Sequence, residues 1–378
     1  MKLIWTALGK GNRISGAFAG VMLAVLAVLA SGPATGQTAA MTIPAATAKP
    51  LSPPILIAHR GASGLSPEHT IFAYRLAIEQ GADFIEPDLV LTQDNVFIAR
   101  HENDITGTTN VASHPEFAAR KTTKIIDGAS HTGWFAEDFT LLEIKTLRAV
   151  ERLPQLRPAS AKYDGQFEIP TLAEIIALAK AETRTTGRAI GIYPETKHPS
   201  YFQSIGKPME AKLVAELNAA GWDSADAPVF IQSFEVNNLK ALHAITKIRL
   251  IQLMDASGGP ADAGLNGAAA SYAAMATPAG LRAIASYAYG IGPNKNLIWD
   301  GKAAPTTLVA DAHAVGLRLH PWTFRAENAF LPAIYRNGTD PATHGDITAE
   351  IQAYLNLGVD GFFTDFALIG FNARKAAH

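Results

Sequence analysis

The chain has 378 residues, 48% of them hydrophobic and 17% charged, and its formal net charge is −2. This composition is typical of a globular protein, and the length allows one large barrel or two ordinary domains. The mildly acidic balance makes nucleic acid an unexpected partner, and the absence of cysteine excludes disulfides, thiolate chemistry and an acylated lipoprotein cysteine.

Residues 1–36 have the pattern of a secretory signal peptide. Lys2, Lys10 and Arg13 form a basic start without an acidic residue, an apolar run covers 17–30, and small residues follow. The apolar run is shorter than the roughly twenty residues that a membrane span requires, which argues against a retained anchor. We therefore expect export, to the periplasm or out of the cell.

Cleavage is expected after Gly36 or Ala40. The mature chain then carries 29 basic and 34 acidic residues, a net charge of about −5, and it has no obvious segment for stable membrane attachment. Residues 37–53 are rich in Ala, Thr and Pro and predict a flexible lead-in. Nothing in this composition indicates an oligomeric state.

The folded part opens on a short apolar run, residues 55–58. Its length and β-branched content indicate a strand buried on both faces, and Gly61 and Gly64 prevent its continuation. His59 and Arg60 are then expected at the carboxyl end of a parallel strand, where α/β barrels and open α/β sheets place their chemistry. Taken alone, a histidine at a strand end is more often a packed, hydrogen-bonded residue than a catalytic one.

A helix is expected next. Ser66 is a good N-cap and Pro67 suits the first helical position, so the pattern predicts a helix that begins there. It is expected to run to Gln80, with Gly81 as the stop signal.

Two strands are predicted after this helix, over 83–92 and 96–99. The link between them is too short for a parallel crossover, so we expect a hairpin-like or otherwise irregular pair. The hairpin register brings His101 close to Glu86 and Asp88.

Residues 103–168 show little sustained periodicity and are too many for an ordinary barrel loop, so they predict an inserted subdomain. Within them, Thr140 and Glu143 have capping-box spacing. Thr171 and Glu174 repeat that spacing and open a clear helix.

Regular alternation then returns. Strands are expected over 189–193, 228–232, 248–253, 317–323 and 359–364, and helices near 207–220, 235–246, 278–287, 304–315 and 346–357. With the first three strands this makes eight, which indicates an α/β fold, a (β/α)8 TIM barrel with an inserted subdomain between the third and fourth strands. A doubly wound fold with two domains is the alternative.

Polar residues gather at the predicted carboxyl ends of these strands. Glu86 and Asp88 are two apart on a strand and project to one side, and Glu195 from another strand completes a three-carboxylate oxygen site. Such a site suits Ca²⁺ or Mg²⁺ better than zinc, because it offers no thiolate. A solvated strand face is the alternative for the Glu-x-Asp pair. The other residues at these strand ends are His59, Arg60, His101, Lys197, Gln232 and Trp322.

Two histidines beside a divalent cation, with Arg60 and Lys197 nearby, indicate phosphoryl chemistry. The cationic groups would neutralise a phosphate, while one imidazole takes a proton and the other gives one. No phosphate-binding glycine motif is present, which favours a phosphodiester over a nucleoside triphosphate. The alternatives are a surface ion pair for Lys197, a core or lid position for Trp322 and a backbone-satisfying role for Gln232.

A series of motifs runs in order through the mature chain: HRGASG (59–64), PEHT (67–70), GADFIEPDL (81–89), TQDNVFIARHE (92–102), DFTLLEIKTL (138–147), IPTLAE (169–174), IGIYPETK (190–197), VFIQSF (229–234), YGIGPNK (289–295), HPWTFR (320–325) and GVDGFFTDF (358–366). Together they closely resemble the glycerophosphodiester phosphodiesterases, particularly their exported, periplasmic bacterial branch.

The resemblance implies a barrel hydrolase that cleaves small glycerophosphodiesters, such as glycerophosphocholine and glycerophosphoethanolamine, to sn-glycerol 3-phosphate and an alcohol. It implies one divalent cation, Ca²⁺ in preference to Mg²⁺. By motif, His59 and His101 resemble the general acid/base pair, and Glu86, Asp88 and Glu195 resemble the metal ligands.

Arg60 and Lys197 are similar to the family's phosphate contacts. Phe234 and Trp322 stand where aromatic residues line the glycerol pocket, and we place Gln232 with the substrate-binding residues. The resemblance also implies that the substrate's own glycerol hydroxyl attacks phosphorus, forming a cyclic phosphate that water then opens.

One residue departs from the family pattern, because the usual His-Asp pair is His101-Glu102 here. Glutamate keeps the charge but adds a methylene, which changes the reach of the carboxylate. Two further functions stay open from the sequence: a phosphodiesterase of the phospholipase C or D type acting on intact lipid, and an inactive barrel used for binding.

Overall fold

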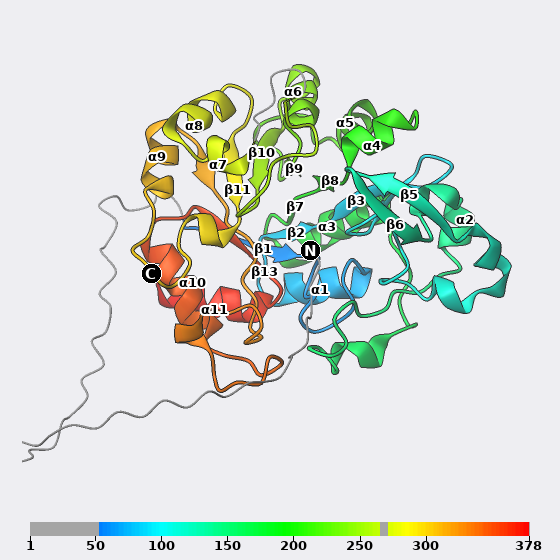
Figure 1. Ribbon diagram of the computed structural model, residues 1–378, viewed down its shortest axis with the longest axis horizontal. Helices are drawn as coiled ribbons and strands as arrows, with labels where there is room; N and C mark the ends of the chain where they lie inside the picture. The colour runs from blue at the N-terminus through cyan, green and yellow to red at the C-terminus, as the bar shows by residue number, and fades with distance from the viewer. Residues whose placement is uncertain (1–52, 265–270, 378) are drawn as a thin grey trace, which may run out of the picture. The chain divides into compact units, whose positions relative to one another are not determined.

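Parallel strands close into a barrel in the computed structural model, which describes residues 53–264 and 271–377 (Figure 1). Two of its strand positions consist of two short strands in succession. The positions are β1 (Ile55–His59), β2 with β3 (Phe84–Glu86, Asp88–Leu91), β7 with β8 (Gly191–Ile192, Glu195–Thr196), β9 (Phe230–Ser233), β10 (Arg249–Met254), β11 (Gly290–Pro293), β12 (Arg318–Leu319) and β13 (Gly361–Thr364).

The barrel closes through two runs of strand pairing. One run is ordered β13-β1-β2-β7 and the other β12-β11-β10-β9-β8-β3-β4. Parallel bridges join β7 to the residue before β9, at Ile192 and Val229, and the segment that follows β12 to β13, at Phe324 and Thr364. The predicted TIM barrel is therefore confirmed, and the two-domain alternative is wrong.

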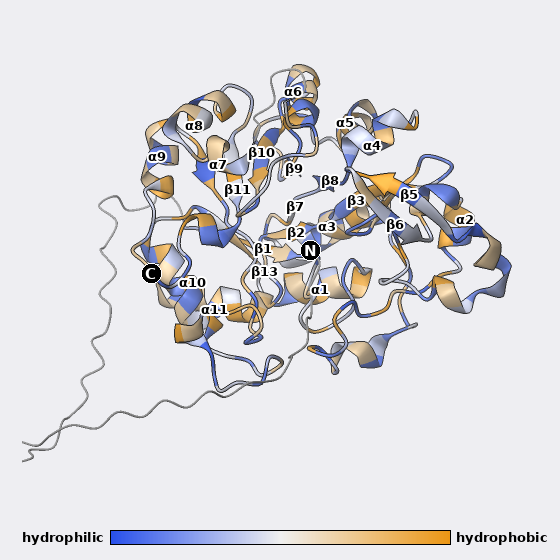
Figure 2. Cartoon of the chain, in the orientation of Figure 1, coloured by the Kyte–Doolittle hydropathy of each residue, from blue (hydrophilic) through white to orange (hydrophobic). Residues whose placement is uncertain are grey.

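Helices surround the barrel (Figure 1). They are α1 (Ile71–Glu79), α3 (Leu172–Thr186), α4 (Pro199–Ser204), α5 (Glu210–Ala219), α6 (Val236–Ile245), α7 (Tyr272–Met275), α8 (Pro278–Ile284), α9 (Leu308–Ala314), α10 (Ile347–Asn356) and α11 (Ala367–Ala376). Figure 2 shows hydrophobic and hydrophilic residues interleaved along them, as expected where one side packs on strands. Within residues 53–264 and 271–377, no helix has the length and hydrophobicity to cross a membrane.

The predicted insertion, residues 103–168, lies between β4 (Phe97–Ala99) and α3. It contains the antiparallel hairpin β5 (Thr122–Ile126) and β6 (Ala129–Gly133), the short helix α2 (Leu141–Ile144), and the 3-10 turns η1 (Val111–Ser113), η2 (Pro115–Arg120), η3 (Ala136–Asp138) and η4 (Ser160–Tyr163). Two more 3-10 turns lie in the barrel, η6 (Lys295–Leu297) and η7 (Ala333–Tyr335). Both predicted capping boxes, at Thr140 with Glu143 and at Thr171 with Glu174, are confirmed.

The sequence predicted eight strands and the parallel ring has eight positions, but the two sets differ by one strand. The predicted strand 96–99 is β4, which pairs antiparallel with β3 and stands outside the parallel ring, as the hairpin prediction required. The ring is completed by β11, which was not predicted, because two glycines and a proline are poor strand formers. Gly290 is needed there: a Cβ would lie 2.6 Å from the backbone oxygen of Arg318.

The predicted strand 83–92 is divided at Pro87 into β2 and β3. Proline has no amide hydrogen, so it interrupts a ladder. β2 pairs with β1 and β7, whereas β3 pairs with β8 and β4. Glu86 ends the first short strand and Asp88 begins the second.

The predicted start of the first helix is wrong. Thr70, not Ser66, is the N-cap, and its hydroxyl accepts a hydrogen bond from the amide of Ala73 at 3.1 Å. The preceding residue His69 has a φ of 57°, in the left-handed region, which ends any helix that would begin earlier. The predicted stop is confirmed, with Gln80 as C-cap and Gly81 at a φ of 99°.

The interior of the barrel explains why the polar residues converge. A small apolar cluster of fully or nearly buried side chains fills it: Ile57, Tyr193, Phe230, Ile251 and Phe363. Alternate residues of a strand share a face, so His59 follows Ile57 and Glu195 follows Tyr193 on the inward side. The site therefore rests on this apolar layer at the carboxyl ends of the strands, as TIM barrels arrange it.

Candidate active site

A cavity of about 290 Å³ lies at the carboxyl ends of the barrel strands. Its lining includes most of the residues predicted from the sequence: His59, Arg60, Glu86, His101, Glu195, Lys197, Gln232, Phe234 and Trp322. Asp88, the remaining predicted residue, is buried beside them in the carboxylate cluster. The structure thus brings all the predicted site residues together.

Glu86, Asp88 and Glu195 form a buried carboxylate triad. One oxygen from each lies within 4.8 Å of the others. Glu86 is held from two sides, by the backbone amide of Arg60 at 2.8 Å and by the Gln232 side-chain amide at 3.1 Å. Gln232 therefore orients a carboxylate, and does more than satisfy the backbone.

The triad fits a divalent cation. Burial, reinforced by Asp88 and Glu195, raises the pKa of Glu86 well above its usual value, and burial raises the pKa of Glu195 to about 8 despite Lys197. The protein's own cationic groups therefore do not neutralise all three carboxylates near neutral pH. The Oδ1 atom of Asp88 is buried and has no hydrogen-bond donor among the described residues. Oxygen ligands of this kind suit Ca²⁺ or Mg²⁺.

Arg60 and Lys197 place positive charge beside the triad. The Arg60 guanidinium donates to Glu68 at 3.0 Å and lies 3.4 Å from Asp88, and the backbone of Arg60 has a φ of 62°. Lys197 donates to Glu195 at 2.8 Å, with both side chains less than a tenth exposed. A surface ion pair, the alternative for Lys197, is therefore wrong.

His59 is oriented by a carboxylate from the last strand. Its Nδ1 lies 2.6 Å from Oδ1 of Asp365, directly after β13. Burial, with Arg60 adding to it, lowers the pKa of His59 to about 4. A neutral imidazole that donates its Nδ1 hydrogen to Asp365 leaves Nε2 as the free, basic nitrogen.

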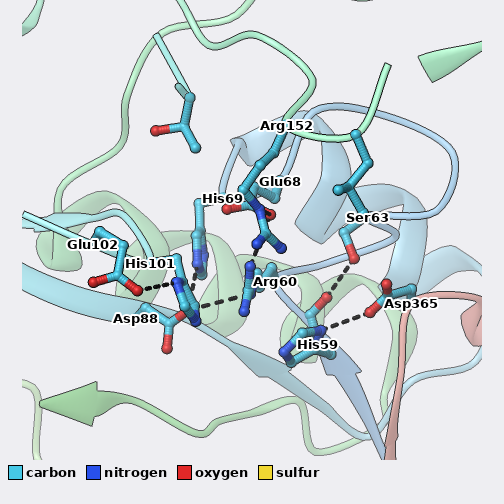
Figure 3. Close-up of polar contacts among 12 residues, drawn as sticks. His59, Arg60, Ser63, Glu68, His69, Asp88, His101, Glu102, Arg152 and Asp365 are labelled. Atoms are coloured by element: carbon cyan, nitrogen blue, oxygen red, sulfur yellow. Dashed lines mark hydrogen bonds and ion pairs between the residues drawn. The ribbon is translucent and has the colours of Figure 1, made fainter. Parts of the chain in front are cut away.

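His101 is arranged in the same way. Its Nδ1 lies 2.7 Å from Oε1 of Glu102. Burial, with the charges of Arg60 and Lys197, lowers the pKa of His101 to about 3. Figure 3 shows His59 and His101 on either side of Arg60, each turned toward its own carboxylate.

Phe234 and Trp322 form an aromatic wall of the cavity. Their rings meet edge to face with centroids 5.7 Å apart, and the indole N–H of Trp322 donates to the backbone oxygen of Gly292 at 2.7 Å. The ammonium of Lys197 lies 5.8 Å from the centre of the Phe234 ring. Trp322 is partly exposed on the cavity and is not a core residue.

Several supporting residues were not predicted from the sequence. His69 lies 2.9 Å from Asp88 through Nε2, and its Nδ1 lies 2.7 Å from the Tyr74 hydroxyl. Arg157 and Arg325 both donate to Asp365. His69 and Arg325 had a signal in the sequence, because they lie in the PEHT and HPWTFR motifs, whereas Arg157 lies in none of the quoted motifs. Arg157 is also far from its partner Asp365 along the chain.

The fold and the site define a TIM barrel with a buried carboxylate triad consistent with a metal site at the carboxyl ends of its strands. The sequence profile of the glycerophosphoryl diester phosphodiesterase family matches residues 59–368. The glycerophosphodiester phosphodiesterase GDPD6 of Arabidopsis thaliana is 39% identical over 341 residues, which cover 85% of this chain and 86% of the plant protein.

A bacterial relative, the glycerophosphodiester phosphodiesterase of Bacillus subtilis, is 31% identical over 85% of this chain and 86% of its own length. The chain therefore belongs to the glycerophosphoryl diester phosphodiesterase family, and the predicted enzyme class is confirmed. The structure of an Oleispira antarctica phosphodiesterase in complex with the product sn-glycerol-3-phosphate has the same fold, with a TM-score of 0.56 at 19% identity over 85% of this chain and 97% of that one.

Proposed function

We propose that the protein hydrolyses small water-soluble glycerophosphodiesters, such as glycerophosphocholine and glycerophosphoethanolamine, to sn-glycerol 3-phosphate and the free alcohol. The observation that carries this proposal is the placement of two histidines, a carboxylate triad and two cationic side chains around one cavity of about 290 Å³. A cavity of this size suits a small polar diester.

His59 and His101 act as the acid/base pair. Each imidazole has its Nδ1 tied to a carboxylate, at 2.6 Å and 2.7 Å, which leaves Nε2 for proton transfer. One imidazole takes the proton of the attacking glycerol hydroxyl as its oxygen bonds to phosphorus. The other imidazole acts as its imidazolium, with a hydrogen on each ring nitrogen when the anionic substrate is bound. It gives the Nε2 proton to the alcohol oxygen as the bond between phosphorus and that oxygen breaks. Water then attacks phosphorus and opens the cyclic phosphate, and the two imidazoles exchange their roles as base and acid in this step.

Arg60 and Lys197 bind the phosphate, and Phe234 and Trp322 form the wall against which the glycerol carbons pack. Both cationic side chains are buried beside the triad, and their charges act strongly there because water is largely excluded. Gln232 contributes by holding Glu86 in place.

Glu86, Asp88 and Glu195 hold one divalent cation, Ca²⁺ in preference to Mg²⁺. A cation bound there supplies positive charge for the phosphate oxygens and lowers the cost of ionising all three carboxylates. Ca²⁺ is preferred because the ligands come from separate, partly constrained strands, and its coordination is more tolerant than the strict octahedron of Mg²⁺.

The first prediction concerns this cation. Release of glycerol 3-phosphate from glycerophosphocholine by the purified protein is expected to stop when EDTA is added, because EDTA removes the divalent cation from the three carboxylates. Adding excess Ca²⁺ is expected to restore the release, more fully than Mg²⁺ does. The measurement is a coupled assay for glycerol 3-phosphate, and release that continues unchanged in EDTA would contradict the cation proposal.

We also propose that the enzyme is exported. The support is the basic and apolar pattern of residues 1–36, which, with the lead-in up to residue 52, lie outside the described residues. In a Gram-negative host, the protein is expected in the periplasmic fraction with a new N-terminus after Gly36 or Ala40. N-terminal sequencing of the fractionated protein checks this, and an intact Met1 in the cytoplasmic fraction would contradict it.

A further inference from the structure

A chain of hydrogen bonds connects the inserted subdomain to His101. The Asp127 carboxylate accepts from Nδ1 of His198 at 2.6 Å, and Nε2 of His198 donates to Oε2 of Glu102 at 2.7 Å. The other oxygen of Glu102 accepts from Nδ1 of His101 at 2.7 Å. We propose that Asp127 and His198 are positioning residues for His101, and that the insertion takes part in catalysis through them.

The tip of the β5–β6 hairpin is built to present Asp127. Ile126 pairs with Ala129, so Asp127 and Gly128 form a two-residue turn, with φ angles of 49° and 79°. Both values lie in the left-handed region that the tight turn of a hairpin requires, and Asp-Gly is a preferred pair for it. The position of the carboxylate is therefore set by the hairpin, not by a flexible loop.

His198 is held in an uncommon backbone conformation. It directly follows the cavity residue Lys197 and precedes α4, with φ 48° and ψ 46°. A residue other than glycine costs free energy in this region, and such strain persists where the surroundings determine it. Here the conformation turns the imidazole so that both ring nitrogens meet carboxylates.

The charges along this chain of hydrogen bonds are complementary. Burial by itself lowers the pKa of His198, but the hydrogen bonds to Asp127 and Glu102 more than offset it and raise the pKa to about 9. Near neutral pH the ring therefore carries a hydrogen on each nitrogen and donates in both directions. A cation lies between two carboxylates, which makes both hydrogen bonds charge-assisted and stronger than neutral ones.

Glu102 is the residue that needs this support. Its side chain is 44% exposed, so packing does not fix its conformation. The hydrogen bond from His198 holds one oxygen, which directs the other toward His101. With Glu102 held, the ring of His101 keeps one orientation and its Nε2 faces the cavity. The added methylene of glutamate gives the carboxylate the length to contact both histidines.

The test rests on the proposed function and compares Asp127→Ala, His198→Ala and the double variant in the glycerophosphocholine assay. Positioning supports only part of the general acid/base contribution of about 10²–10⁴, so we expect kcat to fall about tenfold in Asp127→Ala and further in His198→Ala. KM is expected to stay the same, because neither side chain binds substrate. The double variant is expected to match His198→Ala alone, since Asp127 acts only through His198.

Glu116→Ala is the matched control. Glu116 accepts from His114 at 3.0 Å on the surface of the same insertion and does not connect to the cavity, so kcat is expected to stay at the wild-type value. Thermal unfolding of every variant identifies loss of folding. Wild-type kcat in Asp127→Ala, or effects of Asp127→Ala and His198→Ala that simply multiply in the double variant, would overturn the positioning role.

His101→Ala separates the two proposals. If His101→Ala is inactive while Asp127→Ala is fully active, the proposed function stands and only the positioning role of the insertion fails. If His101→Ala keeps wild-type activity, the acid/base assignment fails, and the positioning proposal fails with it.

Discussion

Replacing His101 or His59 with alanine is expected to lower kcat for glycerophosphocholine by about 10²–10⁴-fold, the range that general acid/base catalysis contributes. Each imidazole has its Nδ1 bound to a carboxylate and its Nε2 free for proton transfer. Neither group has a substitute, because the nearby cationic side chains, Arg60 and Lys197, have pKa values above the usual range and do not exchange protons near neutral pH. The measurement is steady-state kinetics at saturating Ca²⁺.

His114→Ala is the control for these substitutions. This histidine also pairs with a carboxylate, Glu116, but it is partly exposed on the insertion and does not line the cavity. Its removal is expected to leave kcat unchanged. Full activity in His59→Ala or His101→Ala, with an unchanged unfolding temperature, would remove that histidine from the mechanism.

Arg157→Met is expected to lower both stability and kcat. The Arg157 guanidinium lies between two buried carboxylates, 2.6 Å from Glu327 and 2.5 Å from Asp365. Removing one partner of a buried ion pair leaves charge uncompensated and typically costs about 3–5 kcal/mol. Because Asp365 also orients His59, activity at a temperature where the variant is still folded is expected to fall as well. Urea unfolding and kinetics measure the two effects.

The control is Arg75→Met, which removes a partly exposed pair between the exposed Arg75 and Glu182, 3.4 Å apart. Exposed pairs contribute about 0–1 kcal/mol, so the free energy of unfolding is expected to change little. If Arg157→Met unfolds with the same free energy as Arg75→Met, a group other than Arg157 balances the charge of Glu327 and Asp365. Normal kcat in folded Arg157→Met would show that Arg325 alone suffices to hold Asp365.

Short-range rules predicted much of the site correctly. Glu86 and Asp88 are two residues apart, so the alternation of an extended backbone predicted both carboxylates on one side, and they do meet there although Pro87 divides the strand. The link after residue 91 was too short for a crossover, which required the antiparallel pairing of β3 with β4 and brought His101 to the triad. Both arguments depend on residues close in sequence, where backbone geometry leaves few choices.

The same rules failed where tertiary contacts overrode local preference. β11 is a strand although it contains Gly290 and Gly292. A side chain at Gly290 would meet the backbone of Arg318, and one at Gly292 would meet the side chain of Leu253. The first helix starts late because His69 adopts a left-handed conformation that directs its ring to Asp88. Secondary-structure propensity describes an isolated segment. It therefore contains no information about the close neighbours of the β11 glycines or about the Asp88 carboxylate that His69 contacts.

The sequence by itself determined the barrel, the carboxylate triad, the two histidines and the family, because strand periodicity, short spacings and ordered motifs are local properties. Only the tertiary structure decided which groups hold His59 and His198. Asp365 lies 306 residues from His59 along the chain, and Asp127 lies 71 residues from His198. These partners meet because the last strand closes the barrel beside the first, and because the hairpin of the insertion reaches the residue after Lys197. Neither event leaves a pattern in the sequence near the histidines.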